Sequence, residues 1–108
     1  MRETKVLFGT GQTGDGRYIT RTEAQIALRE IGRYAAEQFG GYSLYRHDGG
    51  WINAAGALIQ ESGVTLSVFG IPLPEQETAL ARKIRALMVQ DSVVLVRALS
   101  GEAEFVND

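Results

Sequence analysis

The chain has no cysteine and only one histidine, His47, among its 108 residues. The absence of cysteine excludes a disulfide framework and thiolate metal ligands. A single histidine excludes a site built from several imidazole groups of one chain. The sequence therefore predicts neither a bound metal ion nor another cofactor.

A surplus of basic residues and a long apolar run are missing too. Eleven Lys and Arg residues stand against thirteen Asp and Glu residues, for a formal net charge of -2. This balance does not favour general binding to nucleic acid or to anionic membranes. No apolar run approaches the ~20 residues that span a bilayer. Residues Met1–Lys5 lack the apolar segment of a signal peptide, so we expect a cytoplasmic protein.

The length and the 44% hydrophobic content predict one domain over residues 1–108, with a core that needs no disulfide. Its first element is a short apolar strand over Lys5–Phe8, which we expect to be central in a sheet. Thr20-Arg21-Thr22-Glu23 is a capping box and predicts a helix start. The helix carries an apolar stripe and ends at Gly40-Gly41; the stripe comprises Ala24, Ala27, Leu28, Ile31, Ala35 and Phe39. Gly32 either weakens this helix or marks close packing against it.

The middle of the chain predicts two antiparallel strands. Residues 42–47 alternate in polarity, and Asp48-Gly49-Gly50 is typical of a turn or bulge. After a second turn, residues 57–70 predict one long strand that is interrupted near Ser62-Gly63.

The last third predicts a helix and one or two strands. Pro74 suits the first turn of a helix, whose buried stripe comprises Leu80, Ile84, Leu87 and Met88. Residues 92–97 form a strongly apolar strand that we expect to be buried on both faces. Gly101 permits a turn into Ala103–Val106, which is either an edge strand or an arm onto a neighbouring molecule.

This order is the split βαβ arrangement of a ferredoxin-like α+β domain, with an additional C-terminal strand. Right-handed crossovers place both helices on one face of the antiparallel sheet. The other face is then solvated, covered by loops or buried against another subunit. We expect a homo-oligomer, because closed symmetric assemblies commonly hide such faces.

Several short segments carry a family resemblance. They are Val6-Leu7-Phe8-Gly9, Thr20-Arg21-Thr22-Glu23, Gly50-Trp51 with Gly56, Ile59-Gln60-Glu61 and Gln90-Asp91-Ser92-Val93-Val94. On these segments the chain resembles an uncharacterised bacterial α+β family, known only as a domain of unknown function. The resemblance spans nearly the whole chain. It implies the ferredoxin-like fold and brings no activity with it.

The run Gly9–Gly16 contains the pattern G-x-G-x-x-G. A dinucleotide-binding fingerprint requires these glycines to open a helix, but Asp15–Ile19 separate the last of them from the helix cap. A P-loop requires Lys followed by Ser or Thr, and Arg17 stands there instead. We favour a mobile turn. The alternative is an anion site in which Arg17, Arg21 or Thr13 joins the backbone amides.

A second group of candidate residues surrounds the Asp48–Gly50 signal. Histidine is suited to acid or base chemistry, arginine to binding a carboxylate or phosphate, and aromatic rings to stacking. We favour a strand end with half-buried aromatic residues at a subunit interface over a ligand site. The group comprises Tyr45, Arg46, His47 and Trp51.

From these features we predict a small homo-oligomeric binding protein without a catalytic step of its own. Its expected ligand is a planar anion such as a nucleotide; the candidate ligand-binding residues are Arg17, Arg46, His47, Trp51, Tyr45 and Thr13. One alternative is a small cofactor-free enzyme with His47 as acid or base, although no serine lies in a G-x-S-x-G motif. Another is a protein-binding module that uses the open sheet face or the last strand.

Overall fold

The computed structural model describes residues 2–11 and 17–108. Two helices and five strands follow one another as the sequence predicts, and the α+β, ferredoxin-like fold class is confirmed. The elements are β1 (Glu3–Gly9), α1 (Arg21–Phe39), β2 (Ser43–Ile52), β3 (Leu58–Phe69), α2 (Pro74–Leu87), β4 (Val93–Val96) and β5 (Ala103–Val106).

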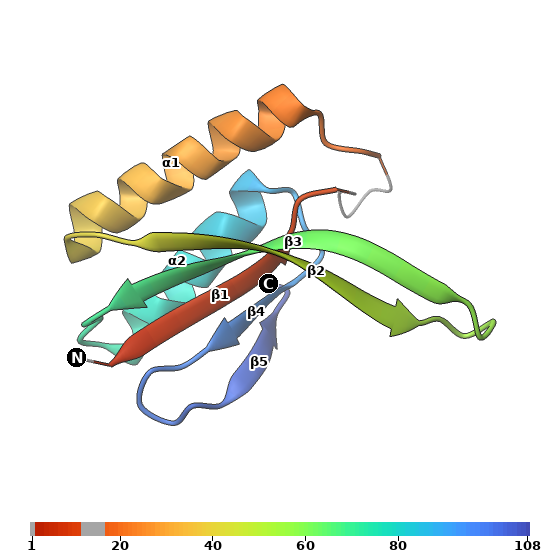
Figure 1. Cartoon of the computed structure of the whole chain (residues 1–108). Coiled ribbons are helices and arrows are strands. Elements are labelled where there is room, and N and C mark those ends of the chain that lie inside the picture. The colour runs from red at the N-terminus through yellow and green to blue at the C-terminus, as the bar shows by residue number, and fades with distance from the viewer. Residues whose placement is uncertain (1, 12–16) are drawn as a thin grey trace.

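The five strands form one antiparallel sheet in the order β2-β3-β1-β4-β5, so β1 is central as expected. Both helices lie on the same face of this sheet (Figure 1). The residues at the C-terminus form an edge strand, because β5 pairs with β4 from Val93↔Val106 to Val96↔Ala103. The sheet face that bears no helix is called the open face below.

The predicted helix boundaries are confirmed. At the start of α1, Thr20 Oγ1 accepts a hydrogen bond from the Glu23 amide, and the Glu23 carboxylate accepts one from the Thr20 amide, each at 3.1 Å. The bond from the Thr20 amide holds the pKa of the Glu23 carboxyl below its usual value. Gly40 ends α1 with a φ of 90°, and Pro74 is the first residue of α2.

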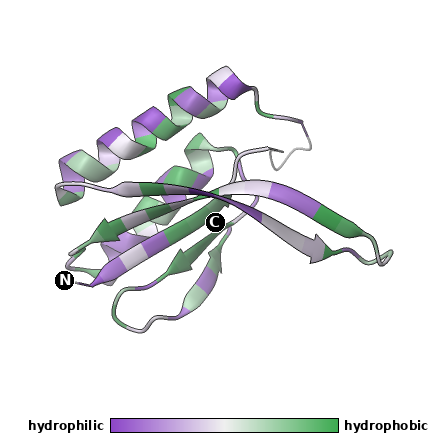
Figure 2. Ribbon diagram, in the orientation of Figure 1, coloured by the Kyte–Doolittle hydropathy of each residue, from purple (hydrophilic) through white to green (hydrophobic). Residues whose placement is uncertain are grey.

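The core lies between the sheet and the helices. Alternate residues of the strands meet the apolar stripes of α1 and α2, and burial of these side chains is the main favourable term in folding. Figure 2 shows hydrophobic residues on the strands beneath the helices and mainly hydrophilic ones on the outer surface of α1. The hydrophobic residues with no exposed surface are Val6, Ile31, Ala35, Leu66, Val68, Leu80, Ala81, Ile84, Met88 and Leu95.

Gly32 is explained by close packing. A Cβ atom at this position would lie 2.4 Å from the hydroxyl oxygen of Tyr42, in the segment that leads from α1 into β2. Glycine is therefore required for the Tyr42 ring to pack against the helix.

The structure corrects the prediction of a turn at Asp48–Gly50. β2 runs through this segment, where Asp48 pairs with Ser62 and Gly50 pairs with Gln60. β3 is likewise continuous through Ser62-Gly63. The chain reverses at the second predicted turn, after Asn53, whose side chain accepts hydrogen bonds from the amides of Ala55 and Ala57. The glycines at 49 and 50 do not form a turn because β2 and β3 remain paired across them.

Because β1 stops opposite Gly63, the distal part of the β2–β3 hairpin extends beyond the rest of the sheet. This two-stranded arm (residues 48–62) projects from the body of the molecule (Figure 1). A further correction concerns β4, which is not buried on both faces. Val93 and Leu95 are buried beneath the helices, whereas Val94 and Val96 lie on the open face and are half-buried.

Candidate ligand-binding groove

A groove of about 910 Å³ lies where the arm leaves the sheet. One wall is the arm, and the opposite wall is the connection between α2 and β4. The end of β1 with the first residues after it, Tyr18, and Phe105 of β5 complete the lining.

Trp51 and Glu61 form the arm side of the groove. Trp51 pairs with Ile59 and Glu61 with Gly49, so the two side chains are diagonal neighbours on one face of the hairpin. The Trp51 indole Nε1–H donates a hydrogen bond of 3.2 Å to Glu61 Oε1. A Cβ atom on Gly49 would meet nothing within 4 Å, which leaves open space opposite Glu61.

The opposite wall is held by the end of α2. The amide of Gln90 donates to the Arg85 carbonyl at 3.0 Å, and the amide of Val89 donates to the Ala86 carbonyl at 3.3 Å. These two bonds form a Schellman motif, in which the residue in the left-handed conformation is normally glycine. Here it is Val89, with a φ of 52°. A β-branched residue in this conformation is strained, and the strain lies next to groove residues Gln90–Ser92.

Gln90 also connects this wall to the end of β1. A Cβ atom on Gly9 would lie 3.1 Å from Gln90 Oε1, so the Gln90 side chain packs directly on the Gly9 backbone. The Gln90 Nε2 donates to the Met88 carbonyl at 3.2 Å. The floor of the groove is therefore backbone at Gly9, with a polar side chain fixed beside it.

Three aromatic side chains border the groove with much of their surface exposed. Tyr18 is 77% exposed, Phe105 is 74% exposed and Trp51 is 52% exposed. Phe105 lies on the open face because its neighbour Val106 is buried in the core. Exposed apolar surface gathered at one concave place is typical of a binding site.

The charged side chains along the groove are carboxylates. Glu61 and Asp91 belong to the lining, and no Lys or Arg is found among the lining residues that the structure describes. The local potential therefore favours an uncharged or cationic ligand over an anionic one.

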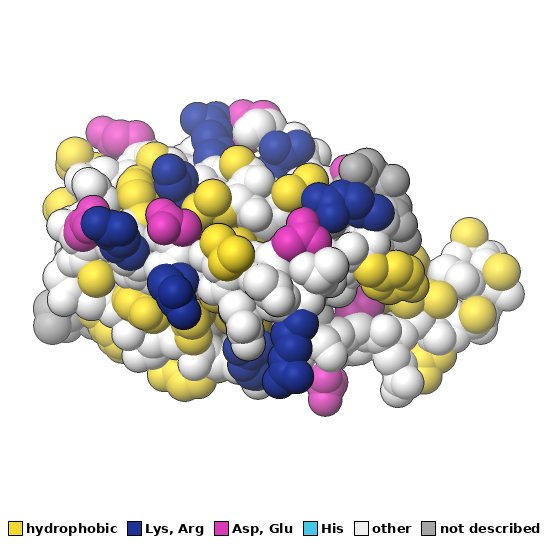
Figure 3. Space-filling view, turned by 90° about the horizontal axis from the view of Figure 1, so that it is seen from above, with side chains coloured by type: hydrophobic (Ala, Val, Ile, Leu, Met, Phe, Trp, Pro, Cys, Tyr) yellow, Lys and Arg dark blue, Asp and Glu magenta, His cyan; other side chains and the backbone are white. Residues whose placement is uncertain are grey.

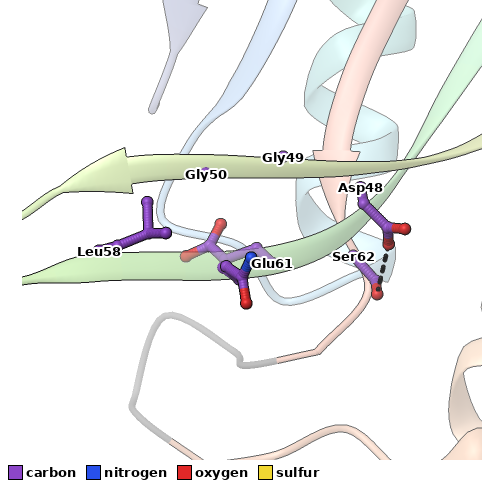
Figure 4. Close-up of a pocket in the computed structure, with 7 residues that line it drawn as sticks. Asp48, Gly49, Gly50, Leu58, Glu61 and Ser62 are labelled. Atoms are coloured by element: carbon purple, nitrogen blue, oxygen red, sulfur yellow. Dashed lines mark hydrogen bonds between the residues drawn. The ribbon is translucent and has the colours of Figure 1, made fainter.

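A smaller hollow of about 450 Å³ lies against the arm, and Figure 4 shows its lining side chains. Ser62 Oγ donates a hydrogen bond of 3.3 Å to Asp48 Oδ1 there. Gly49 and Gly50 expose the β2 backbone beside it. Residues 60–62 line both this hollow and the groove, so both border the same short part of β3.

The predicted ligand-binding residues are distributed over different parts of the fold. Tyr45, His47 and Trp51 share the open face of β2, whereas Arg46 lies on the opposite face because strand residues alternate. Of the six predicted residues, Trp51 is the one in the described lining of the groove.

The other predicted residues that the structure describes are not part of the groove lining. The His47 ring packs on Gly63, where an added Cβ would be 2.7 Å from His47 Cε1. Arg17 is exposed and forms an ion pair with Glu23 at 3.3 Å, beside the first turn of α1. Thr13 lies outside the described residues.

No sequence pattern selected Tyr18, Phe105, Glu61 or Asp91 as a ligand-binding residue. The alternation of the hairpin places Glu61 with Trp51, but only once the turn is assigned to Asn53–Ala57. Asp91 and Phe105 lie at the groove because of the order of the strands in the sheet. No local sequence pattern encodes that order.

Two further features bear on the kind of site. In residues 2–11 and 17–108 there is no group of three or more His, Asp or Glu side chains suited to holding a metal ion. Neither helix in this part of the chain combines the length and apolar character required to cross a membrane.

No protein-family model matches the chain, and no curated protein matches it in sequence. Two solved structures are similar in fold: a phage SAM lyase in complex with S-methyl-5′-thioadenosine and a phage SAM lyase in the apo state. Each has a TM-score of 0.65 and 16% sequence identity, over 98% of this chain and 88% of the other. At this identity the likeness shows that the chain shares the fold of these lyases.

Proposed function

We propose that this protein binds a small nucleoside-type molecule, uncharged or cationic, in the groove between the arm and the α2–β4 connection. The observation that carries the proposal is the combination of three exposed aromatic side chains with the Glu61 carboxylate around one concave site. Aromatic faces stack on nucleobases. Carboxylates accept hydrogen bonds from ribose hydroxyl groups.

The similar phage enzyme supports the same class of ligand. S-methyl-5′-thioadenosine, with which that enzyme was solved, is an adenosine with a thioether at its 5′ carbon and no phosphate. A ligand without phosphate agrees with a groove whose described charged side chains are Glu61 and Asp91. On this account Arg17 and Arg46 are not the main ligand contacts, and a phosphorylated nucleotide binds less well than the nucleoside.

A catalytic step is a second candidate, and the Glu61 and Asp91 carboxylates favour it. S-adenosylmethionine carries a positive sulfonium centre, which carboxylates at the groove attract. In this version the substrate's own carboxylate attacks the aminobutyrate carbon bonded to the sulfonium sulfur and closes a lactone. The carbon–sulfur bond breaks, its electron pair stays on sulfur, and S-methyl-5′-thioadenosine leaves. Chromatography of the reaction mixture tests it, and a product level equal to that of a protein-free control would contradict it.

We also propose that copies of the chain associate through the open face. Leu7, Val94 and Phe105 form a continuous apolar row across β1, β4 and β5. Lys5 and Glu3 lie on the body of this face and pair with each other, with Nζ and Oε1 3.6 Å apart. An apolar row on a face with little net charge suits a second copy of itself. By contrast, basic and acidic side chains are mixed over the helices (Figure 3).

Isothermal titration calorimetry tests the ligand proposal. We expect S-methyl-5′-thioadenosine and adenosine to bind, and AMP to bind more weakly because its phosphate meets Glu61 and Asp91. Asp91→Asn should reduce the difference between adenosine and AMP. Absence of binding for every nucleoside, or tighter binding of AMP, would contradict the proposal.

Replacing the aromatic side chains of the groove shows where the nucleobase of the ligand binds. Stacking is worth about 1–3 kcal/mol per base, so at least one of Tyr18→Ala and Phe105→Ala should weaken the binding of S-methyl-5′-thioadenosine by about fivefold or more. Glu30→Gln, on the exposed surface of α1, is the matched control and should bind as the wild type does. Equal affinity in all variants would place the ligand elsewhere.

A further inference from the structure

We infer that Trp51 is a positioning residue for Glu61, holding one carboxylate oxygen so that the other is presented to the ligand. This inference rests on the proposed function, because Glu61 is taken as the acceptor of the ligand's hydroxyl groups. It assigns the single tryptophan of the chain a role other than stacking alone.

The hairpin places Trp51 where it can hold the Glu61 side chain. Trp51 and Glu61 come from neighbouring strands of the arm and point to the same face. The indole Nε1–H is 3.2 Å from Glu61 Oε1, and no other side-chain hydrogen bond to Glu61 is found in the described chain. The second oxygen, Oε2, therefore retains its full capacity to accept hydrogen bonds.

Gly49 leaves free space beside the Glu61 carboxylate. Gly49 stands directly opposite Glu61 in the ladder, and a Cβ there would meet nothing within 4 Å. A larger residue at Gly49 would occupy the surface next to the carboxylate. The glycine thus leaves room for a ligand beside the oxygen that Trp51 does not hold.

The hydrogen bond from Trp51 also fixes the Glu61 side chain before a ligand binds. Glu61 lies on an exposed arm, where its flexible side chain would otherwise lose rotamer freedom upon binding. A hydrogen bond formed before binding removes part of this cost. Immobilising one such side chain corresponds to roughly two- to tenfold in affinity, which is the expected effect of losing the indole N–H.

A double-mutant cycle on the full chain separates positioning from direct stacking. The variants are Trp51→Phe, which retains an aromatic ring but has no N–H, Glu61→Ala, and both together. The probe is S-methyl-5′-thioadenosine, measured by calorimetry. We expect Trp51→Phe to weaken binding roughly two- to tenfold in the wild type and to have no further effect once Glu61 is alanine. Equal weakening in both backgrounds would overturn the inference.

A readout without ligand keeps the two proposals separate. The indole ¹⁵N–H resonance of Trp51 in the free protein should shift in Glu61→Ala and stay closer to its wild-type position in Glu61→Gln, which retains an acceptor oxygen. An unchanged resonance in Glu61→Ala would overturn the positioning role, whether or not a nucleoside binds. A shifted resonance without any binding of S-methyl-5′-thioadenosine would overturn the proposed function alone.

Discussion

Gly63 lies where β1, β2 and β3 meet, at the base of the arm. A Cβ at this position would be 2.7 Å from His47 Cε1 and 3.1 Å from the Phe8 carbonyl oxygen. The imidazole can move, but the carbonyl belongs to the β1 backbone. We therefore expect Gly63→Ala to lower the free energy of unfolding by about 1–3 kcal/mol in urea denaturation.

Gly49→Ala is the matched control, because it adds the same methyl group to the same hairpin where no atom lies within 4 Å. It should change the free energy of unfolding by less than about 0.5 kcal/mol. Similar losses in both variants would show that contact with His47 and Phe8 is not the cause.

Val89 is a second residue whose backbone conformation determines how a substitution changes the free energy of unfolding. A left-handed conformation costs an L-residue roughly 1–2 kcal/mol, and glycine removes this cost while adding about 0.4–1 kcal/mol of unfolded-chain entropy. Val89→Gly should therefore raise the free energy of unfolding by up to about 1 kcal/mol, as measured by thermal and urea unfolding. A clear loss of stability would contradict the strain assigned to Val89 from its φ of 52°.

Several residue roles were predictable because their partners are close in sequence. Thr20 and Glu23 form their capping box within one turn, and Gly40 ends the helix that they begin. Gly49 and Gly63 were not predictable in this way. Their importance depends on Glu61 and on His47 with Phe8, which only the pairing of strands brings to them.

At the scale of elements, one buried carboxylate connects α2 to three other parts of the fold. Glu77 is 3% exposed and accepts hydrogen bonds from Thr4 Oγ1 at 2.5 Å and from the Ala98 amide at 2.9 Å. Arg97 Nη1 lies 3.6 Å from Glu77 Oε1, while its Nη2 donates to Glu104 of β5 at 2.7 Å. The bond to Glu104 raises the pKa of the Arg97 guanidinium.

Removing this carboxylate leaves the Thr4 hydroxyl and the Ala98 amide without their acceptor, whereas Arg97 keeps its bond to Glu104. We expect Glu77→Ala to lower the free energy of unfolding by about 2–4 kcal/mol, because each buried donor left without an acceptor costs about 1–3 kcal/mol. Glu77→Gln retains acceptor oxygens and should cost less. Chemical denaturation measures both, and a loss below about 1 kcal/mol for Glu77→Ala would show that the Glu77 contacts contribute little to stability.

Periodicity predicts the helices and strands well, because each buried stripe repeats locally. It does not predict where a hairpin reverses when two signals compete. Asp48-Gly49-Gly50 and Asn53–Gly56 both look like turns, and the hydrogen-bonded ladder over residues 43–52 decides for the second. This choice creates the arm, and with it the groove.

At the scale of the whole molecule, the open face predicts self-association. Native mass spectrometry and light scattering over a range of concentrations should show an assembly of two or more copies. Tyr45→Glu adds a charge to the open face at a residue that is 55% exposed, and it should shift the population toward the monomer with an unchanged circular dichroism spectrum. A wild-type protein that is monomeric at every concentration would contradict this proposal.

Nucleoside binding in the groove between the arm and the α2–β4 connection can be followed in a ¹H–¹⁵N correlation spectrum of the full chain, titrated with S-methyl-5′-thioadenosine. We expect saturable shifts for the single indole N–H, of Trp51, and for the amides of Gly9, Asp91 and Phe105, with the outer surface of α1 unaffected. Shifts confined to α1, or none at saturating ligand, would contradict nucleoside binding in the groove.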